Sequence, residues 1–279
     1  MRKRVVVKIG GNAFENSGNT PGSSSANRNR GSERGRENGL AGLAKAIKSL
    51  AGHEFILVHG GGAEISRALR AAHREPVFVD GLRVTTAEDM DIVERVLSQE
   101  INCRMASALS RNGVRCQRLS GRTSGLLTVE PMRRNGRDMG FVGRIVRVNP
   151  EPVLSLLAQG KVPVISPVSA DEQGQAYNVN ADSAAAAIAG AAACTDVIYL
   201  TDVPGVRAGG RFLSRLSVPE ARDLIAARVI QGGMIAKMES AFEAVSLGVE
   251  QVYISQWHGE NTLANLLADQ PSSGTTIHR

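Results

Sequence analysis

The amino-acid sequence predicts an α/β fold with a mainly parallel central sheet. Short apolar runs rich in β-branched residues alternate with longer segments rich in alanine and leucine along most of the 279 residues. This alternation is typical of strands joined by crossover helices, and we interpret the buried runs as parallel strands. With 42% hydrophobic residues, the chain can bury a large core as one long domain or two fused lobes.

The elements follow in order along the chain. We expect strands at Arg4–Ile9, Phe55–His59, Val164–Pro167, Val197–Thr201 and Gln251–Ser255. We expect helices at Leu40–Ala51, Ala63–His73, Ala87–Arg111, Pro150–Gln159, Ala181–Ala193, Val218–Ala227 and Met234–Leu247. The segment Arg115–Arg147 contains short β-like pieces punctuated by Gly and Asn, which predicts antiparallel hairpins. Residues Asn16–Asn38 are polar and glycine-rich and predict a flexible surface loop, with a binding or lid role as the alternative.

Composition excludes several classes of protein. Three scattered cysteines indicate neither a disulfide framework nor a zinc site. No signal peptide or membrane span is visible, so we expect a cytoplasmic protein without membrane partners. The net charge of +6 is concentrated in Arg115–Arg147, where eight arginines face two acidic residues. This segment is either a solvated hairpin surface or a surface for an anionic ligand or acidic partner. Nucleic acid is disfavoured, because no aromatic residues interleave with the arginines.

Two glycine-rich strand ends predict phosphate binding. The first strand ends in Lys8 followed by Gly10 and Gly11, and the second runs into Gly60, Gly61 and a third glycine before a helix. Glycines let the backbone approach an anion closely, and a lysine adds a full positive charge. Neither motif has the spacing of a P-loop or of a dinucleotide fold. The pattern therefore predicts phosphate chemistry in another architecture.

Three later motifs place further polar groups at strand ends or helix starts. Asn178 and Asp182 precede an alanine-rich helix, where they are either caps or part of an anion site. A strand ending in Thr201 and Asp202 opens into a Pro-Gly turn at Gly205, which suits the wall of a nucleotide pocket. A glycine pair ending at Gly233 precedes a helix whose first turn carries Lys237. A second lysine near phosphates suits phosphoryl transfer.

Taken in order, these five motifs resemble the amino acid kinase family. The resemblance extends from Val5 to the Gly274-Thr275-Thr276-Ile277 ending, with further matches at Gly81–Thr85, Gly140–Gly143 and Val148–Asn149. It implies a three-layer αβα sandwich, with residues 1–168 as a lobe for acceptor binding and dimerisation and residues 169–279 as an ATP-binding lobe. It is closest to members that phosphorylate the side-chain carboxylate of N-acetyl-L-glutamate with ATP and Mg²⁺ in arginine biosynthesis. A homodimer acting on a small acidic amino-acid derivative is the implied state.

The resemblance also implies residue roles. Lys8 and Lys237 would stabilise the transferring phosphoryl group, and Asp182 would hold the two lysines. Gly10, Gly11, Gly60 and Gly61 would face the phosphoryl group or the reacting carboxylate with their backbone. Arg83, helped by Asn178, would bind the acceptor's α-carboxylate. Thr201, Asp202, Gly205 and Gly233 would line the ATP site.

The sequence departs from the family pattern in two places. Arg122 and its neighbours stand where the family usually has an acidic turn residue, and the Asn16–Asn38 segment is unusual. Two alternatives therefore stay open. One is a kinase for aminoadipate or glutamate displayed on an acidic carrier protein, which the arginine cluster favours. The other is a non-catalytic sensor of amino acids or nucleotides, which would need a lost catalytic group, although Lys8, Asp182 and Lys237 are all present.

Overall fold

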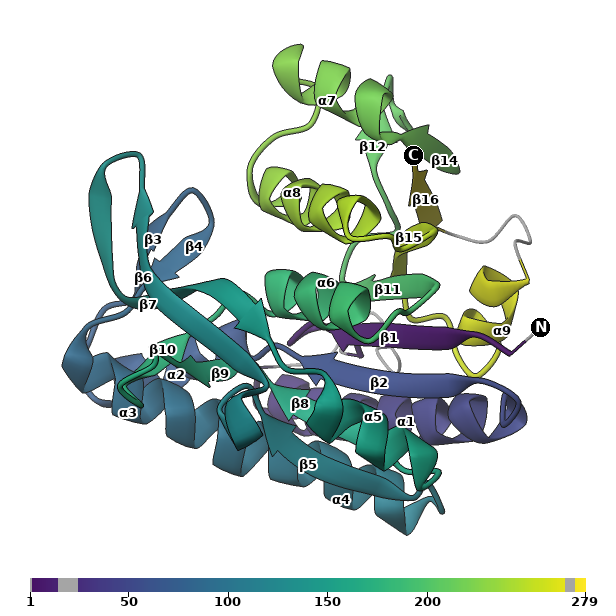
Figure 1. Cartoon of the computed structure of the whole chain (residues 1–279), viewed down its shortest axis with the longest axis horizontal. Coiled ribbons are helices and arrows are strands. Elements are labelled where there is room, and N and C mark those ends of the chain that lie inside the picture. The colour runs from purple at the N-terminus through teal and green to yellow at the C-terminus, as the bar shows by residue number, and fades with distance from the viewer. Residues whose placement is uncertain (1, 15–24, 269–273) are drawn as a thin grey trace.

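The central element of the structure is an eight-stranded, mainly parallel sheet (Figure 1). The computed structural model describes residues 2–14, 25–268 and 274–279, and only the backbone of 25–34. The strand order is β14-β16-β15-β11-β1-β2-β8-β5. Their bounds are β1 Arg4–Ile9, β2 Glu54–His59, β5 Cys116–Ser120, β8 Val162–Ser166, β11 Asp196–Thr201, β14 Arg215–Ser217, β15 Gln251–Gln256 and β16 Gly274–His278. Only the β15–β16 pair is antiparallel in this sheet as described.

Helices cover both faces of the sheet and complete three layers. Their bounds are α1 Ser25–Ser49, α2 Gly62–Ala71, α3 Ala87–Glu94, α4 Asn102–Arg111, α5 Glu151–Ala158, α6 Ala181–Ala191, α7 Val218–Ala226, α8 Gly233–Ser246 and α9 Thr262–Leu267. The expected helix Ala87–Arg111 is one continuous rod in which a π-helical stretch, η1 (Arg95–Ile101), joins α3 to α4. This arrangement confirms the predicted α/β sandwich.

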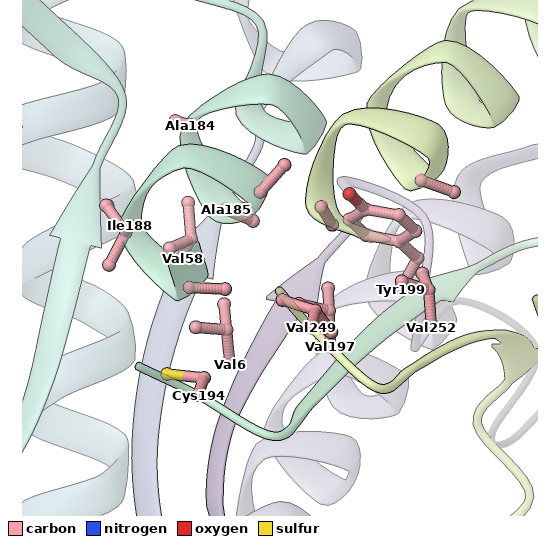
Figure 2. Close-up of a cluster of buried hydrophobic side chains, with 14 of the residues drawn as sticks. Val6, Val58, Ala184, Ala185, Ile188, Cys194, Val197, Tyr199, Val249 and Val252 are labelled. Carbon is pink, nitrogen blue, oxygen red and sulfur yellow. The ribbon is translucent and has the colours of Figure 1, made fainter. Parts of the chain in front are cut away.

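Alternate residues of the buried strands supply two separate cores. On β1, Val6 faces α6 and α8, whereas Val5 and Val7 face α1, α4 and α9. Figure 2 shows the first core, in which Val6 and Val58 lie beneath α6 and Tyr199 lies beneath α8. Because side chains alternate along a strand, Lys8 shares the face of Val6. The lysine therefore points to the side where α6 and α8 begin.

Smaller strand pairs build an arm beside the sheet. β3 (Val77–Val79) pairs with β4 (Leu82–Val84), and β6 (Leu127–Arg134) with β7 (Arg137–Val148). The long hairpin closes into a small barrel with β9 (Val168–Ala170) and β10 (Ala176–Asn178). The strands β12 (Arg207–Ala208) and β13 (Arg211–Phe212) form a separate short hairpin. The two hairpins β3–β4 and β6–β7 project together beyond the sheet (Figure 1).

Two sequence-based expectations are corrected. Residues 25–38 are not a loop, because α1 begins at Ser25; residues 16–24 of the expected loop lie outside the described part of the chain. Arg36 on this helix pairs with Glu64 at 2.8 Å, so a tertiary contact supports a helix that composition alone does not favour. The first β-like piece of the Arg115–Arg147 segment is not part of a hairpin, because β5 pairs in parallel with β8 at the sheet edge.

The lobe boundary at residue 168 stays a prediction. β9 begins at residue 168 and β10 follows it, but they pair with β6 and β7, which precede it. None of the helices in the described part of the chain combines the length and apolar character that a membrane span needs.

The helical assignment of residues 25–38 can be tested by a proline at Glu37. A proline inside a helix removes a backbone hydrogen bond and costs about 3 kcal/mol. We expect Glu37→Pro to lower the free energy of unfolding in urea by that amount, while Glu37→Ala changes it by less than about 0.5 kcal/mol. Equal stability of the two variants would mean that residue 37 is not within a helix.

Candidate active site

Lys8 and Lys237 meet on a single buried carboxylate. The Lys8 Nζ lies 2.8 Å from Asp182 Oδ1, and the Lys237 Nζ donates to Asp182 Oδ2 at 2.8 Å. The three side chains are only 10–12% exposed. They come from the end of β1, the first turn of α6 and the first turns of α8. The structure therefore brings together the three residues that the sequence analysis placed at the reaction.

Electrostatics keep this cluster charged. Burial acts to raise the pKa of Asp182, but Lys8 and Lys237 outweigh it and hold that pKa well below its usual value. Burial and the charge of Lys8 lower the pKa of Lys237, and Asp182 opposes this shift. Two cations around one anion leave a net positive charge in a site that is largely shielded from water, which favours an arriving anion.

Asn180 is the N-cap of α6, a position for which the sequence analysis considered Asn178 and Asp182. Its side chain caps α6 by accepting hydrogen bonds from the backbone N–H of Asp182 at 2.8 Å and of Ser183 at 3.1 Å. The Tyr199 hydroxyl donates to the Asp182 carbonyl at 3.2 Å. The Asn-Ala-Asp spacing before an alanine-rich helix is an N-cap signal that could have identified Asn180.

A cavity of about 200 Å³ opens beside the cluster. Lys8 and Asp182 line it together with Arg83, Asn178 and the glycines that follow β2. Arg83 is buried, and its Nη2 donates to Gly62 O and to Ser66 Oγ, each at 2.8 Å. Its Nη1 has no hydrogen-bond partner within the described residues. A buried guanidinium nitrogen without a partner is costly, so it indicates a place for an anionic ligand group.

Asn178 lines the same cavity but is already engaged. One of its two side-chain N–H groups donates to Thr85 Oγ1 at 3.2 Å, which leaves the second N–H as a donor for an anionic ligand. Arg122 is not among the lining residues of this cavity. It pairs with Glu94 at 2.8 Å on the surface. The unusual turn around Arg122 therefore does not bring its charge to this cavity.

The glycine loops contribute in different ways. The N–H groups of Gly10 and Gly60 are donated to Leu200 O and Ile9 O, each at 2.9 Å. These two glycines extend the sheet and do not have free donors for a ligand. Gly61 allows α2 to approach η1, since a Cβ there would lie 2.4 Å from Ile101 Cδ1. Gly11 and Gly61 line the cavity.

A second recess of about 230 Å³ adjoins the first at Gly11 and Gly62. It is also lined by Thr201 and Asp202, whose side chains are hydrogen-bonded to each other at 3.1 Å. Gly205 does not line this recess; a Cβ on it would meet Thr275 Oγ1 at 2.6 Å, so it serves close packing. Gly233 begins α8, and apart from its chain neighbours and the backbone of its own helix no atom of the described residues lies within 4 Å of the place its Cβ would occupy.

Comparison with known proteins agrees with this geometry. The model of the amino acid kinase family matches residues 3–256. The chain belongs to the amino acid kinase family. This confirms the resemblance carried by the five motifs and the fold that it implied.

Relatives and solved structures of this family cover most of the chain. The acetylglutamate kinase of Chloroflexus aggregans is 45% identical over 216 residues, which are 77% of this chain and 85% of that protein. The acetylglutamate kinase of Kosmotoga olearia is 34% identical over 277 residues, which are 99% of this chain and 91% of that protein. The structure of smu.665 from Streptococcus mutans UA159 has a TM-score of 0.79 at 28% identity, covering 100% of this chain and 99% of that one.

The charge balance of the cluster makes a testable prediction for a kinase of this family. Asp182→Asn removes the anion that raises the pKa of Lys237, so this pKa should fall further. We expect kcat to drop by about 100-fold or more. The alkaline limb of the kcat–pH profile should move to lower pH, because Lys237 then loses its proton sooner.

The control for this prediction is Asp91→Asn, which changes an exposed carboxylate on α3. It should leave both kcat and the pH profile at wild-type values. If folded Asp182→Asn kept the wild-type alkaline limb, Asp182 would not control the charge of the lysines.

Proposed function

We propose that this chain is an acetylglutamate kinase, which transfers the γ-phosphoryl group of ATP to the side-chain carboxylate of N-acetyl-L-glutamate in arginine biosynthesis. The carrying observation is that Arg83, with an unpartnered buried nitrogen, shares one cavity with Lys8 and Asp182. An acceptor with two carboxylates fits this cavity, one on Arg83 and the other directed at Lys8. Relatives named acetylglutamate kinase at 34–45% identity over most of the chain support the same reaction.

The chemistry suits a site built from charges and backbone. A carboxylate oxygen of the acceptor attacks the γ-phosphorus, a new P–O bond forms, and the bond to the β-phosphate oxygen breaks to release ADP. A carboxylate is already ionised near neutral pH, so no proton has to be removed by a general base. The difficulty is the approach of two anions, and Lys8 and Lys237 offset their repulsion.

The adjoining recess is the proposed place of the nucleotide phosphates. Asp202 supplies one carboxylate there, and no group of three or more His, Cys, Asp or Glu side chains in the described residues could hold a metal ion by itself. This donor set fits Mg²⁺, which is commonly held by one or two carboxylates, water and substrate phosphates. Asp202 would hold the ion through this carboxylate or a bridging water. When bound, Mg²⁺ neutralises charge on the phosphates.

The predicted homodimer remains a prediction. The helical segment from Ala87 to Arg111 carries an apolar stripe that could serve both the core and a partner. Met90, Val93, Val96, Leu97 and Ile101 are buried within the chain's own core, so the stripe alone does not supply a partner face. Static light scattering of the purified protein tests the assembly.

The role of Arg83 can be tested by its conservative replacement. Arg83→Lys keeps a positive charge but loses the planar fork that binds a carboxylate through two nitrogens. We expect the KM for N-acetylglutamate to rise by about tenfold or more, since a charge-assisted hydrogen bond contributes about 1.5–3 kcal/mol. The KM for ATP should stay within about twofold. A selective rise in the KM for ATP would reassign Arg83 to the nucleotide.

A comparison of acceptors decides between the free substrate and the carrier-bound alternative. Four of the eight clustered arginines, Arg122, Arg134, Arg144 and Arg147, have carboxylate partners within 4 Å, which reduces the field that a carrier would meet. We expect a coupled ADP-release assay to show turnover of free N-acetylglutamate. Its kcat/KM should be unchanged in an Arg133→Glu, Arg137→Glu variant at low and high salt.

Turnover of carrier-linked acceptor alone, abolished by this double variant, would support the alternative. ATP binding without turnover of either acceptor would support the non-catalytic sensor.

A further inference from the structure

The turns of the two projecting hairpins, β3–β4 and β6–β7, are linked by hydrogen bonds to each other and to α8, the helix that carries Lys237. We call this linked group the joint. Both hairpins close with two-residue turns, Asp80-Gly81 and Asn135-Gly136, in which every residue has positive φ. The twist of such turns matches that of the strands they join, so the tips are well defined. Asn135 Nδ2 donates to Asp80 Oδ2 at 2.8 Å, which joins one tip to the other.

Arg134 extends this joint to α8. Its Nε donates to Asp80 Oδ2 at 3.3 Å, and its Nη1 and Nη2 donate to the Glu239 carboxylate at 3.4 Å. Gly81 also lies near the start of α8, since a Cβ added to it would come within 3.8 Å of Gly233 Cα. One guanidinium thus lies between two carboxylates that belong to different parts of the site.

Each carboxylate lies close in sequence to a residue of the candidate site. Asp80 precedes Arg83 by three residues, and the short strand β4 (Leu82–Val84) carries Arg83 into the acceptor cavity. Glu239 follows Lys237 by two residues on α8. The Arg134 bridge therefore fixes the arm that binds the acceptor relative to the helix that carries a catalytic lysine.

We propose that Arg134 is a positioning residue for phosphoryl transfer, acting through its bridge between Asp80 and Glu239. The inference rests on the proposed function, because it concerns how Arg83 and Lys237 are held at the distance that transfer requires. Rates of transfer depend steeply on such alignment. Exposed ion pairs are individually weak, so we expect the loss of both to have a modest effect, roughly three- to tenfold on kcat/KM.

The variants are Arg134→Gln and its matched control Arg137→Gln. Arg137 stands opposite Arg134 across the same turn, and no carboxylate of the described residues lies within 4 Å of its guanidinium nitrogens. We expect Arg134→Gln to lower kcat/KM for N-acetylglutamate three- to tenfold, with both a higher acceptor KM and a lower kcat. The KM for ATP and the melting temperature should match those of Arg137→Gln.

Two further measurements distinguish an electrostatic bridge from packing. The ratio of wild-type to Arg134→Gln kcat/KM should fall toward one as salt rises, because surface ion pairs are screened. The charge swap Arg134→Glu, Glu239→Arg restores an attractive pair between positions 134 and 239 but not the pair with Asp80. It should recover part of the activity that Arg134→Glu alone loses.

Hydrogen exchange tests the joint without any acceptor. We expect amides of residues 77–84 to exchange faster in Arg134→Gln than in Arg137→Gln. Equal exchange and equal kcat/KM in the two variants, or a swap no better than Arg134→Glu alone, would overturn the proposal. If the wild type does not phosphorylate N-acetylglutamate, the proposed function fails, and the exchange comparison still decides whether Arg134 holds the arm.

Discussion

The buried carboxylate of Asp182 is the constraint on which the rest of the site depends. Two lysines from opposite ends of the sequence can lie side by side only if an anion separates them, because like charges repel strongly away from water. Lys8 reaches Asp182 because β1 lies next to β11 in the sheet and directs this side chain toward α6. The strand order, the packing of α6 on α8 and the cap on α6 all serve to place one carboxylate.

This arrangement has a cost that a ligand can recover. The cluster carries excess positive charge in a shielded place, and Arg83 keeps a buried nitrogen without a partner among the described residues. Both features lower the stability of the free protein and raise its affinity for anionic ligands. A site adjusted only for stability would pair every charge. The unsatisfied groups are therefore more informative about function than the satisfied ones.

The sequence predicted best where local pattern and chemistry coincide. Arg4–Ile9 was predicted with its correct bounds, because an apolar run followed by two glycines has few other structural solutions. The loop predicted for residues 25–38 was wrong because a polar segment shows no hydrophobic periodicity that would indicate a helix. The contact of Arg36 with Glu64 is tertiary and cannot be seen in the sequence. β5 was assigned to a hairpin because Gln117 and Arg118 are exposed at the sheet edge, which removes the apolar signature of a buried strand.

Within the site, the same limit applies to individual side chains. The glycines after Lys8 pointed to phosphate, but only the hydrogen bonds of the fold show that Gly10 and Gly60 donate to neighbouring strands. The two cavities meet at Gly11 and Gly62, so phosphoryl transfer between their ligands would take place against backbone. A side chain at Gly11 would press on the Glu64 carboxylate at 3.3 Å. Under the proposed function, glycine at position 11 keeps the wall shared by the two cavities free of a side chain, so the ligands of both would meet against backbone.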